Sequence, residues 1–232
     1  MKVNRQIPQD IAKLAEIIRK YDFTSIIEPY PLEQAALNWK EWNKFDISDL
    51  TFTISCSKQK PIPNNINRIA IVLDINYIYG NLEEECDVFQ NYQLNLCIKG
   101  YKLGTSNESK FFSWHLDKEE NTDASFIHPL YHFHAGGKRL KGKIDKDSEN
   151  FVISSPRLAH PPMDIILAIH FIIQNFVNGS EVKEKEQLIH DHDYCEIVSR
   201  AQQRVLDPYF GAFSKQSKHK DYSRENLFPL YL

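Results

Sequence analysis

The sequence predicts an α+β fold, in which helices at both ends of the chain pack on an antiparallel sheet. Apolar residues recur with the 3.6-residue period of a helix near both ends of the chain, and with the two-residue period of a strand between them. The connections between the alternating segments are short and polar, with no room for crossover helices. These observations favour an antiparallel meander of four to five strands over a parallel sheet.

Two amphipathic helices are expected before the sheet. The first covers residues 8–21, and Pro8 suits its first turn. Its apolar face consists of Ile11, Leu14, Ala15 and Ile18. The second helix starts at Pro31 and repeats this spacing in Leu32, Ala35, Ala36 and Trp39, with Trp42 extending the stripe. We interpret both tryptophans as core residues.

Alternation of apolar and polar residues then predicts strands over 50–55, 69–79, 92–99 and 112–116, with a fifth in the histidine-rich segment 128–134. The acidic stretch Glu83-Glu84-Glu85 is expected at a solvated turn.

After the strands, a pair of helices is expected to pack on the sheet. Residues 165–177 are apolar on nearly all sides, which predicts the most buried helix, starting after Asp164 and ending at Asn178-Gly179. Residues 181–187 are charged and expected to be exposed. A last helix is expected to begin with a capping box of Asp193 and Glu196 and to end at Asp207-Pro208. We therefore predict one α+β domain over residues 1–210 and a polar, mobile tail over 211–232.

Composition indicates a cytoplasmic protein with no membrane contact. The 232 residues are 42% hydrophobic and 25% charged, with a net charge of −3, so no global charge attracts nucleic acid or anionic lipid. The first residues lack the apolar segment of a secretory signal, and the most apolar window, 165–173, is short of the ~20 residues that a membrane span needs. The four cysteines have no Cys-x-x-Cys spacing, and Cys97 alternates with apolar residues in a strand, which indicates reduced thiols.

The segment from His128 to Gly137 carries the main candidate site. In a strand, one face carries His128, Leu130, His132 and His134, and the other carries Tyr131 and Phe133. A basic turn follows directly, with its first cations at Lys138, Arg139 and Lys141.

Three uses of this histidine row remain open. As metal ligands, His132 and His134 would need a third imidazole, from His128 or His115, and we see no local acidic ligand. As general acid and base on a phosphodiester, they would act beside a phosphate held by Lys138, Arg139 and Lys141. As structural residues, they would satisfy hydrogen bonds on a half-exposed sheet face. No cofactor is expected.

Other histidines are weaker candidates. His160, on the loop before the buried helix, would face the row if that loop folds back. His170 is expected to be a hydrogen-bonded core residue. The run His190-Asp-His-Asp193 is interpreted as a solvated helix start, and Cys195 has no context that supports a catalytic thiol. The chain contains no nucleophile elbow, phosphate-binding glycine loop, HExxH or kinase motif.

An N-terminal helix, a four-stranded meander, His128-Pro129, Ser155-Pro156 and an apolar helix over 165–176 follow one another in this order. This arrangement, over roughly residues 8–210, resembles the ubiquitin-conjugating (E2-like) fold, whose His-Pro-Asn and Ser-Pro steps would match the two dipeptides. Leu130 replaces the family's asparagine, and no cysteine follows within the next twenty residues. The resemblance therefore implies a binding relative without thioester chemistry. Residues 126–137 also resemble a strand of small intracellular toxins from toxin–antitoxin modules, which implies a nuclease.

Two functions follow as hypotheses. The first is an intracellular adaptor that binds a protein partner through the sheet. The second is a histidine-dependent nuclease acting on RNA, of toxin or defence-module type, with nucleic acid held by the basic turn over 138–146. A nuclease requires His132, His134 and a third polar group to converge in a concave pocket, whereas an adaptor needs only an exposed patch.

Overall fold

A computed structural model describes residues 5–39, 44–56, 65–80, 87–102, 109–119, 127–136, 156–214 and 220–229. It confirms the α+β fold. One six-stranded sheet has the order β1-β2-β3-β4-β5-β6, and every neighbouring pair is antiparallel. The strands are β1 (Lys44–Ser55), β2 (Ile66–Tyr79), β3 (Phe89–Lys102), β4 (Ser109–Lys118), β5 (Tyr131–Ala135) and β6 (Leu158–Ala159).

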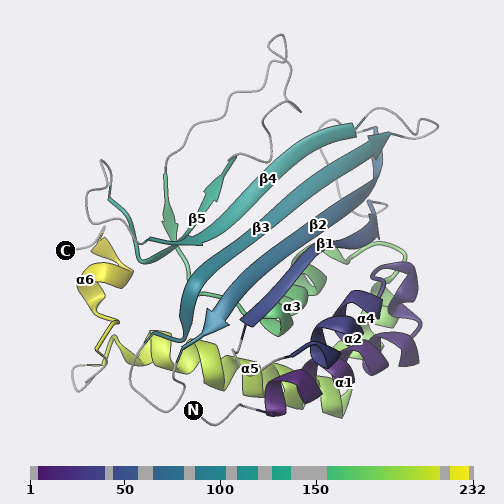
Figure 1. Cartoon of the computed structure of the whole chain (residues 1–232). Coiled ribbons are helices and arrows are strands. Elements are labelled where there is room, and N and C mark those ends of the chain that lie inside the picture. The colour runs from purple at the N-terminus through teal and green to yellow at the C-terminus, as the bar shows by residue number, and fades with distance from the viewer. Residues whose placement is uncertain are drawn as a thin grey trace.

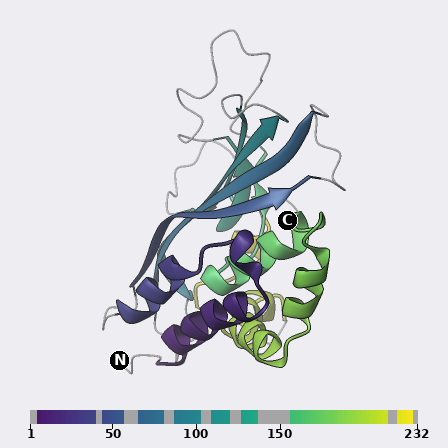
Figure 2. The same cartoon turned by 90° about the vertical axis from the view of Figure 1, so that its right-hand side faces the viewer.

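Helices α1 to α5 lie on one face of this sheet (Figures 1 and 2). The helical elements are α1 (Gln6–Lys20), η1 (Phe23–Ser25), α2 (Tyr30–Leu37), α3 (Ile165–Phe176), α4 (Val182–Ile189), α5 (His192–Gly211) and α6 (Arg224–Leu227). No helix in the described part of the chain is long and apolar enough to cross a membrane.

The core lies between the sheet and the helices, as the sequence periods predict. Ile71, Leu73 and Ile75 of β2 are buried at alternate positions, together with Ile169 and Ile172 of α3. Burying apolar surface of this kind contributes about 25 cal/mol per Å². The sheet and α3 thus form the centre of the hydrophobic core.

A buried carboxylate ties three of these elements together. Asp164 is the N-cap of α3, since its Oδ1 accepts a hydrogen bond from Leu167 N at 2.9 Å. Its Oδ2 lies 2.5 Å from Nη2 of Arg204 on α5 and accepts a hydrogen bond from the hydroxyl of Tyr79 on β2 at 3.0 Å. The side chains of Asp164 and Arg204 are 1% and 8% exposed, so this ion pair is inside the core.

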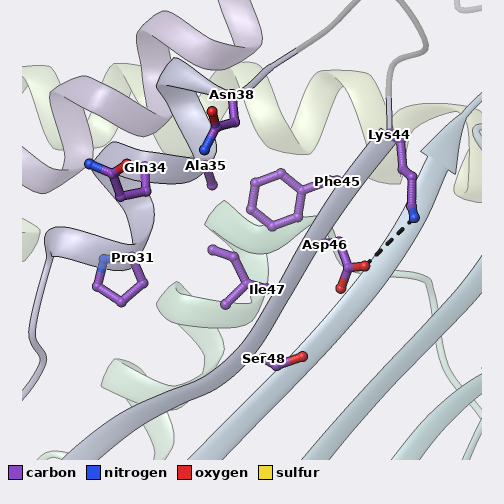
Figure 3. A pocket seen from close by; sticks show the side chains of 9 residues that line it. All are labelled: Pro31, Gln34, Ala35, Asn38, Lys44, Phe45, Asp46, Ile47 and Ser48. Carbon is purple, nitrogen blue, oxygen red and sulfur yellow. Dashed lines mark ion pairs between the residues drawn. The ribbon is translucent and has the colours of Figure 1, made fainter.

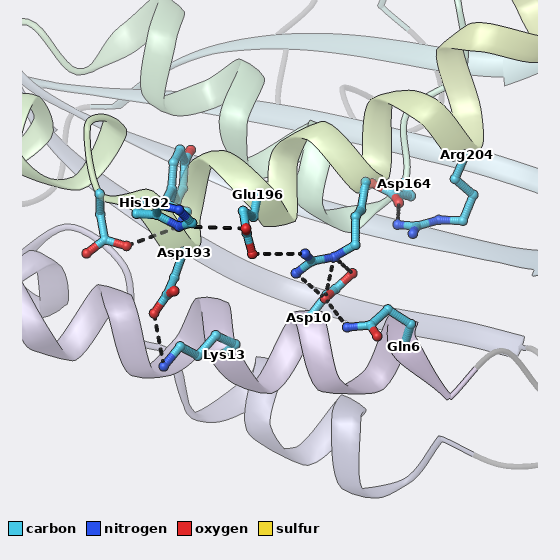
Figure 4. A network of polar contacts seen from close by, with 11 residues as sticks. Gln6, Asp10, Lys13, Asp164, His192, Asp193, Glu196 and Arg204 are labelled. Atoms are coloured by element: carbon cyan, nitrogen blue, oxygen red, sulfur yellow. Dashed lines mark hydrogen bonds and ion pairs between the residues drawn. The ribbon is translucent and has the colours of Figure 1, made fainter.

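A second, more exposed network joins α1 to α5 (Figure 4). Arg200 Nη2 lies 2.8 Å from Asp10 Oδ1, and Gln6 donates to the same oxygen at 2.8 Å. Lys13 lies 3.2 Å from Asp193 near the other end of α1.

Two predicted features of the C-terminal helices are wrong. The N-cap of α5 is Asp191 rather than Asp193, because Asp191 Oδ1 accepts a hydrogen bond from Tyr194 N. Its Oδ2 accepts hydrogen bonds from Lys20 and Tyr21 at the C-terminal end of α1. Pro208 does not end the helix, which continues to Gly211. The fully buried Tyr209 explains the extension, since its packing in the core holds the last turn.

The charged segment after residue 181 also forms a helix of its own, α4, which buries Leu188. Beyond residue 210, Tyr222 and Leu227 are buried in the same core. The described part of the segment predicted as a polar tail is thus anchored at these two residues, and the mobility of the remainder stays a prediction.

Substituting Arg204 by leucine would leave the buried carboxylate of Asp164 without its cation. Removing one partner of a buried ion pair typically costs 3–5 kcal/mol, so we expect the free energy of unfolding to fall by about that amount. Urea unfolding followed by circular dichroism measures it. The control is Arg19→Leu, which removes the partner of Glu33 in a half-exposed pair 3.0 Å apart and should cost about 0–1 kcal/mol. Equal losses in the two variants would contradict the role assigned to Arg204.

Candidate functional site

The face of the sheet opposite the helices carries two rows of polar side chains. Cross-strand pairing places Asn76, Gln93, Asp117 and His132 side by side on β2 to β5. The neighbouring row consists of Asp74, Asn95, His115 and His134. Because side chains two residues apart share a face, both rows lie on the same side of the sheet.

Four histidines form a continuous line at one end of these rows. The ring centroids are 5.5 Å apart for His128 and His132, 5.6 Å for His132 and His134, and 5.2 Å for His134 and His115. Tyr131 points the other way and is fully buried in the core. The predicted alternation therefore holds from Tyr131 to His134. It is wrong for residues 128–130, which precede β5, and Leu130 packs against the core instead of sharing the face of His132.

Two carboxylates accompany the histidines, and the sequence interpretation missed both. Asp117 Oδ2 lies 3.2 Å from Nε2 of His134, and Glu119 Oε2 lies 3.4 Å from Nε2 of His128. The expectation that no acidic group lies near the row is therefore wrong, because β4 pairs with β5 and places Asp117 directly opposite His132. Continuing the alternation of residues 112–116 by one residue would have put Asp117 on the face of His115.

Hydrogen bonds within the protein leave His115 and His132 with different capacities to bind a proton or a ligand. Nε2 of His115 contacts the carbonyl oxygen of Gly136, and its Nδ1 contacts the side chain of Asn95. Both nitrogens are used inside the protein, which leaves His115 no lone pair for a metal ion. His132 differs, because its Nδ1 lies 2.9 Å from the carbonyl oxygen of Pro129, to which it donates. In the neutral ring this bond places the lone pair on Nε2.

A polar pocket of about 430 Å³ lies over this part of the sheet. It is lined by Asn76, Asn91, Tyr92, Gln93, Asp117, Lys118, Glu119, His132, His134 and Arg157. Arg157 comes from the residues just before β6, which pairs with β5. No local motif marks Arg157 in the sequence, since only the pairing of β6 brings it to the histidines.

Burial controls the charge of this pocket. Burial, together with the neighbouring histidines and Arg157, lowers the pKa of His134 to about 4. Burial likewise lowers the pKa of His132 and raises that of Asp117. The imidazoles of His132 and His134 are consequently neutral at pH 7.

His160 does not join the row. Its ring packs 4.5 Å from Phe133 and 6.3 Å from Phe171 of α3, on the helix side of the sheet. The loop does fold back on β5, with His160 N donating to Tyr131 O at 3.1 Å, but it meets the opposite face. His170 is a hydrogen-bonded histidine as expected, with its Nδ1 3.0 Å from the hydroxyl of Tyr194.

The basic residues Lys138, Arg139 and Lys141 lie outside the described residues, as does the rest of the turn over 138–146, and their role stays a prediction. Metal ligation gains no support, since no group of three or more histidine, cysteine, aspartate or glutamate side chains within the described ranges is arranged to hold an ion.

The C-terminal segment supports the histidine strand from the side. Tyr131 and Tyr222 both donate to Oδ1 of Asp87 at 2.6 Å. Leu130 N donates to the carbonyl oxygen of Asn226 in α6 at 2.7 Å. Leu130 and Tyr131, which lie between the Pro129 carbonyl and His132, are thereby held in place.

A second hollow, of about 380 Å³, lies between α2 and the edge strand β1 (Figure 3). Pro31, Gln34, Ala35 and Asn38 line it from the helix, and residues 44–48 line it from the strand. Its charged lining groups, Lys44 and Asp46, lie 3.7 Å apart as an exposed pair. It contains no histidine and offers a groove rather than a reactive site.

Comparison with protein-family models, curated proteins and solved structures finds no match to this chain. Its site therefore has to be interpreted from its own chemistry.

The lowered pKa of His134 makes stability depend on pH. The folded state holds this imidazole neutral to about pH 4, whereas the unfolded chain protonates it near pH 6.5, so stability is lost as the pH falls through this window. Between pH 6.5 and 4.5, we expect the free energy of unfolding of the wild type to fall about 1 to 2 kcal/mol more than that of His134→Gln. Urea unfolding at several pH values tests this.

The matched control is His192→Gln, because His192 is 82% exposed and should leave the pH dependence of the wild type unchanged. Parallel curves for the wild type and His134→Gln would contradict the assignment.

Proposed function

We propose that this protein is a histidine-dependent enzyme that cleaves a phosphodiester, with RNA as its substrate. The observation that carries the proposal is the convergence of His132, His134, Asp117 and Arg157 in one polar pocket. An enzyme site needs such a convergence of polar groups in a hollow, whereas a binding patch can be flat, and this supports the proposal.

The residues divide the chemistry as follows. His132 Nε2 takes the proton of the ribose 2′-hydroxyl, whose oxygen attacks the phosphorus. The guanidinium of Arg157 stabilises the charge that develops on the phosphoryl oxygens. The bond to the 5′-oxygen breaks, and this oxygen receives a proton from the pair formed by Asp117 and His134.

The pKa shifts of these residues indicate that the proposed reaction is faster below pH 7 than above it. His132 stays deprotonated below its ordinary pKa of 6.5, because its pKa is lowered. The donor pair holds a proton only at lower pH, since the pKa of His134 is about 4 and that of Asp117 is raised from 3.8. The reaction should therefore be faster between pH 4.5 and 6 than at pH 7.5.

Cleavage of a labelled single-stranded RNA by the purified chain tests the proposal. We expect His132→Ala to lower the rate by about 10²- to 10⁴-fold, the usual contribution of a general base. DNA of the same sequence should stay intact because it lacks the 2′-hydroxyl, and a chelator should leave the rate unchanged.

The control for this experiment is His160→Ala, which removes a part-buried histidine from the opposite face of the same region. Cleavage by His132→Ala at the wild-type rate would overturn the role of His132 as the general base. Loss of cleavage in His160→Ala but not in His132→Ala would do the same. Loss of cleavage with chelator would indicate a metal-dependent reaction instead.

A second candidate function is an adaptor, in line with the E2-like resemblance. The supporting observation is the groove between α2 and the edge strand β1, because edge strands beside a helix accept extended peptides by strand addition. If RNA is left intact under all conditions, affinity capture with the wild type and with Ala35→Arg, which would fill the groove, tests this function. Capture of the same proteins by both forms would argue against the groove.

A further inference from the structure

The pocket has two chemically different halves. One contains His132 and His134 with the charged residues Asp117, Glu119 and Arg157. The other is lined by the neutral amides Asn76, Asn91 and Gln93. Lys118 also lines the pocket. Its ammonium lies 2.9 Å from Asp87 Oδ2 and donates a hydrogen bond to the carbonyl oxygen of Phe89 at 2.9 Å. Cleavage of a phosphodiester does not need the amide half.

The amides are placed by the sheet itself. Asn76 and Gln93 are direct cross-strand partners, so their Cβ atoms are about 5 Å apart. Gln93 is in turn opposite Asp117, which is opposite His132. With about 4.8 Å between strands, the amide pair lies roughly 10–14 Å from His132 along one line. Asn91 reaches the same pocket from a left-handed backbone conformation, φ 50°, at an irregularity in the pairing of β2 and β3.

We infer that the amide half binds the adenine base of a nucleotide whose phosphate lies at the histidine half. A carboxamide presents one donor and one acceptor side by side, which matches the N6 amino group and N7 of adenine. Guanine presents two acceptors on that edge and is typically bound by arginine or lysine. Among the described lining residues, Arg157 belongs to the histidine half and Lys118 is already bound by Asp87, so adenine is the better match.

In this inference, only the position of the phosphate rests on the proposed function. Binding of the adenine base can be measured whether or not the protein cleaves RNA. Isothermal titration calorimetry of the full chain would compare adenosine 5′-monophosphate, guanosine 5′-monophosphate and ribose 5-phosphate. We expect the adenine nucleotide to bind about tenfold more tightly than either of the others.

Gln93→Leu should weaken binding of adenosine monophosphate about tenfold and leave ribose 5-phosphate unaffected. Gln90→Leu is the matched control, since Gln90 is an exposed amide on the same strand outside the pocket lining. His132→Ala should retain adenine binding while losing cleavage.

Equal affinity for adenosine monophosphate and ribose 5-phosphate, tighter binding of guanosine monophosphate, or no binding of any nucleotide would each overturn the inference. Adenine binding that depends on Gln93 in a protein that leaves RNA intact would uphold this inference and refute the cleavage reaction. Cleavage with no preference for adenine would refute the inference alone.

Discussion

The buried carboxylate of Asp164 is the interaction on which the rest of the structure depends. A carboxylate inside a core is costly unless it is paired and hydrogen-bonded, and Asp164 meets this requirement only when α3, α5 and β2 are all in place. Its contacts with Leu167, Arg204 and Tyr79 therefore couple the formation of three elements. Residues that precede α3 are positioned by the same arrangement, including Met163, whose carbonyl oxygen accepts from Tyr92 of β3.

This coupling reaches the candidate site through a short stretch of chain. The residues leading to Asp164 run along β5, with β6 paired to it and His160 N bonded to Tyr131 O. Arg157 is thereby carried to the pocket on one face, while the ring of His160 packs on Phe133 on the other. The packing of α3 and the composition of the pocket are thus parts of one arrangement.

Several parts of the fold and site could be predicted because their signals are local. The strand alternation predicted that the histidines of β5 share a face, and the apolar run after Asp164 predicted the buried helix. The helix start at Asp191 and the passage through Pro208 could not be predicted this way. Contacts with Lys20 and Tyr21 select Asp191, and the burial of Tyr209 sustains the last turn. Both depend on residues distant in the sequence.

By itself, the sequence determined the fold class, the antiparallel order of the strands and the common face of His132 and His134. These follow from hydrophobic periods and short connections, which act over a few neighbouring residues. Only the tertiary structure decided that Asp117, Glu119 and Arg157 join this face, that His160 does not, and that His132 and His134 are neutral. Strand register sets which side chains meet, and burial sets their charge, and both arise only when distant segments pack together.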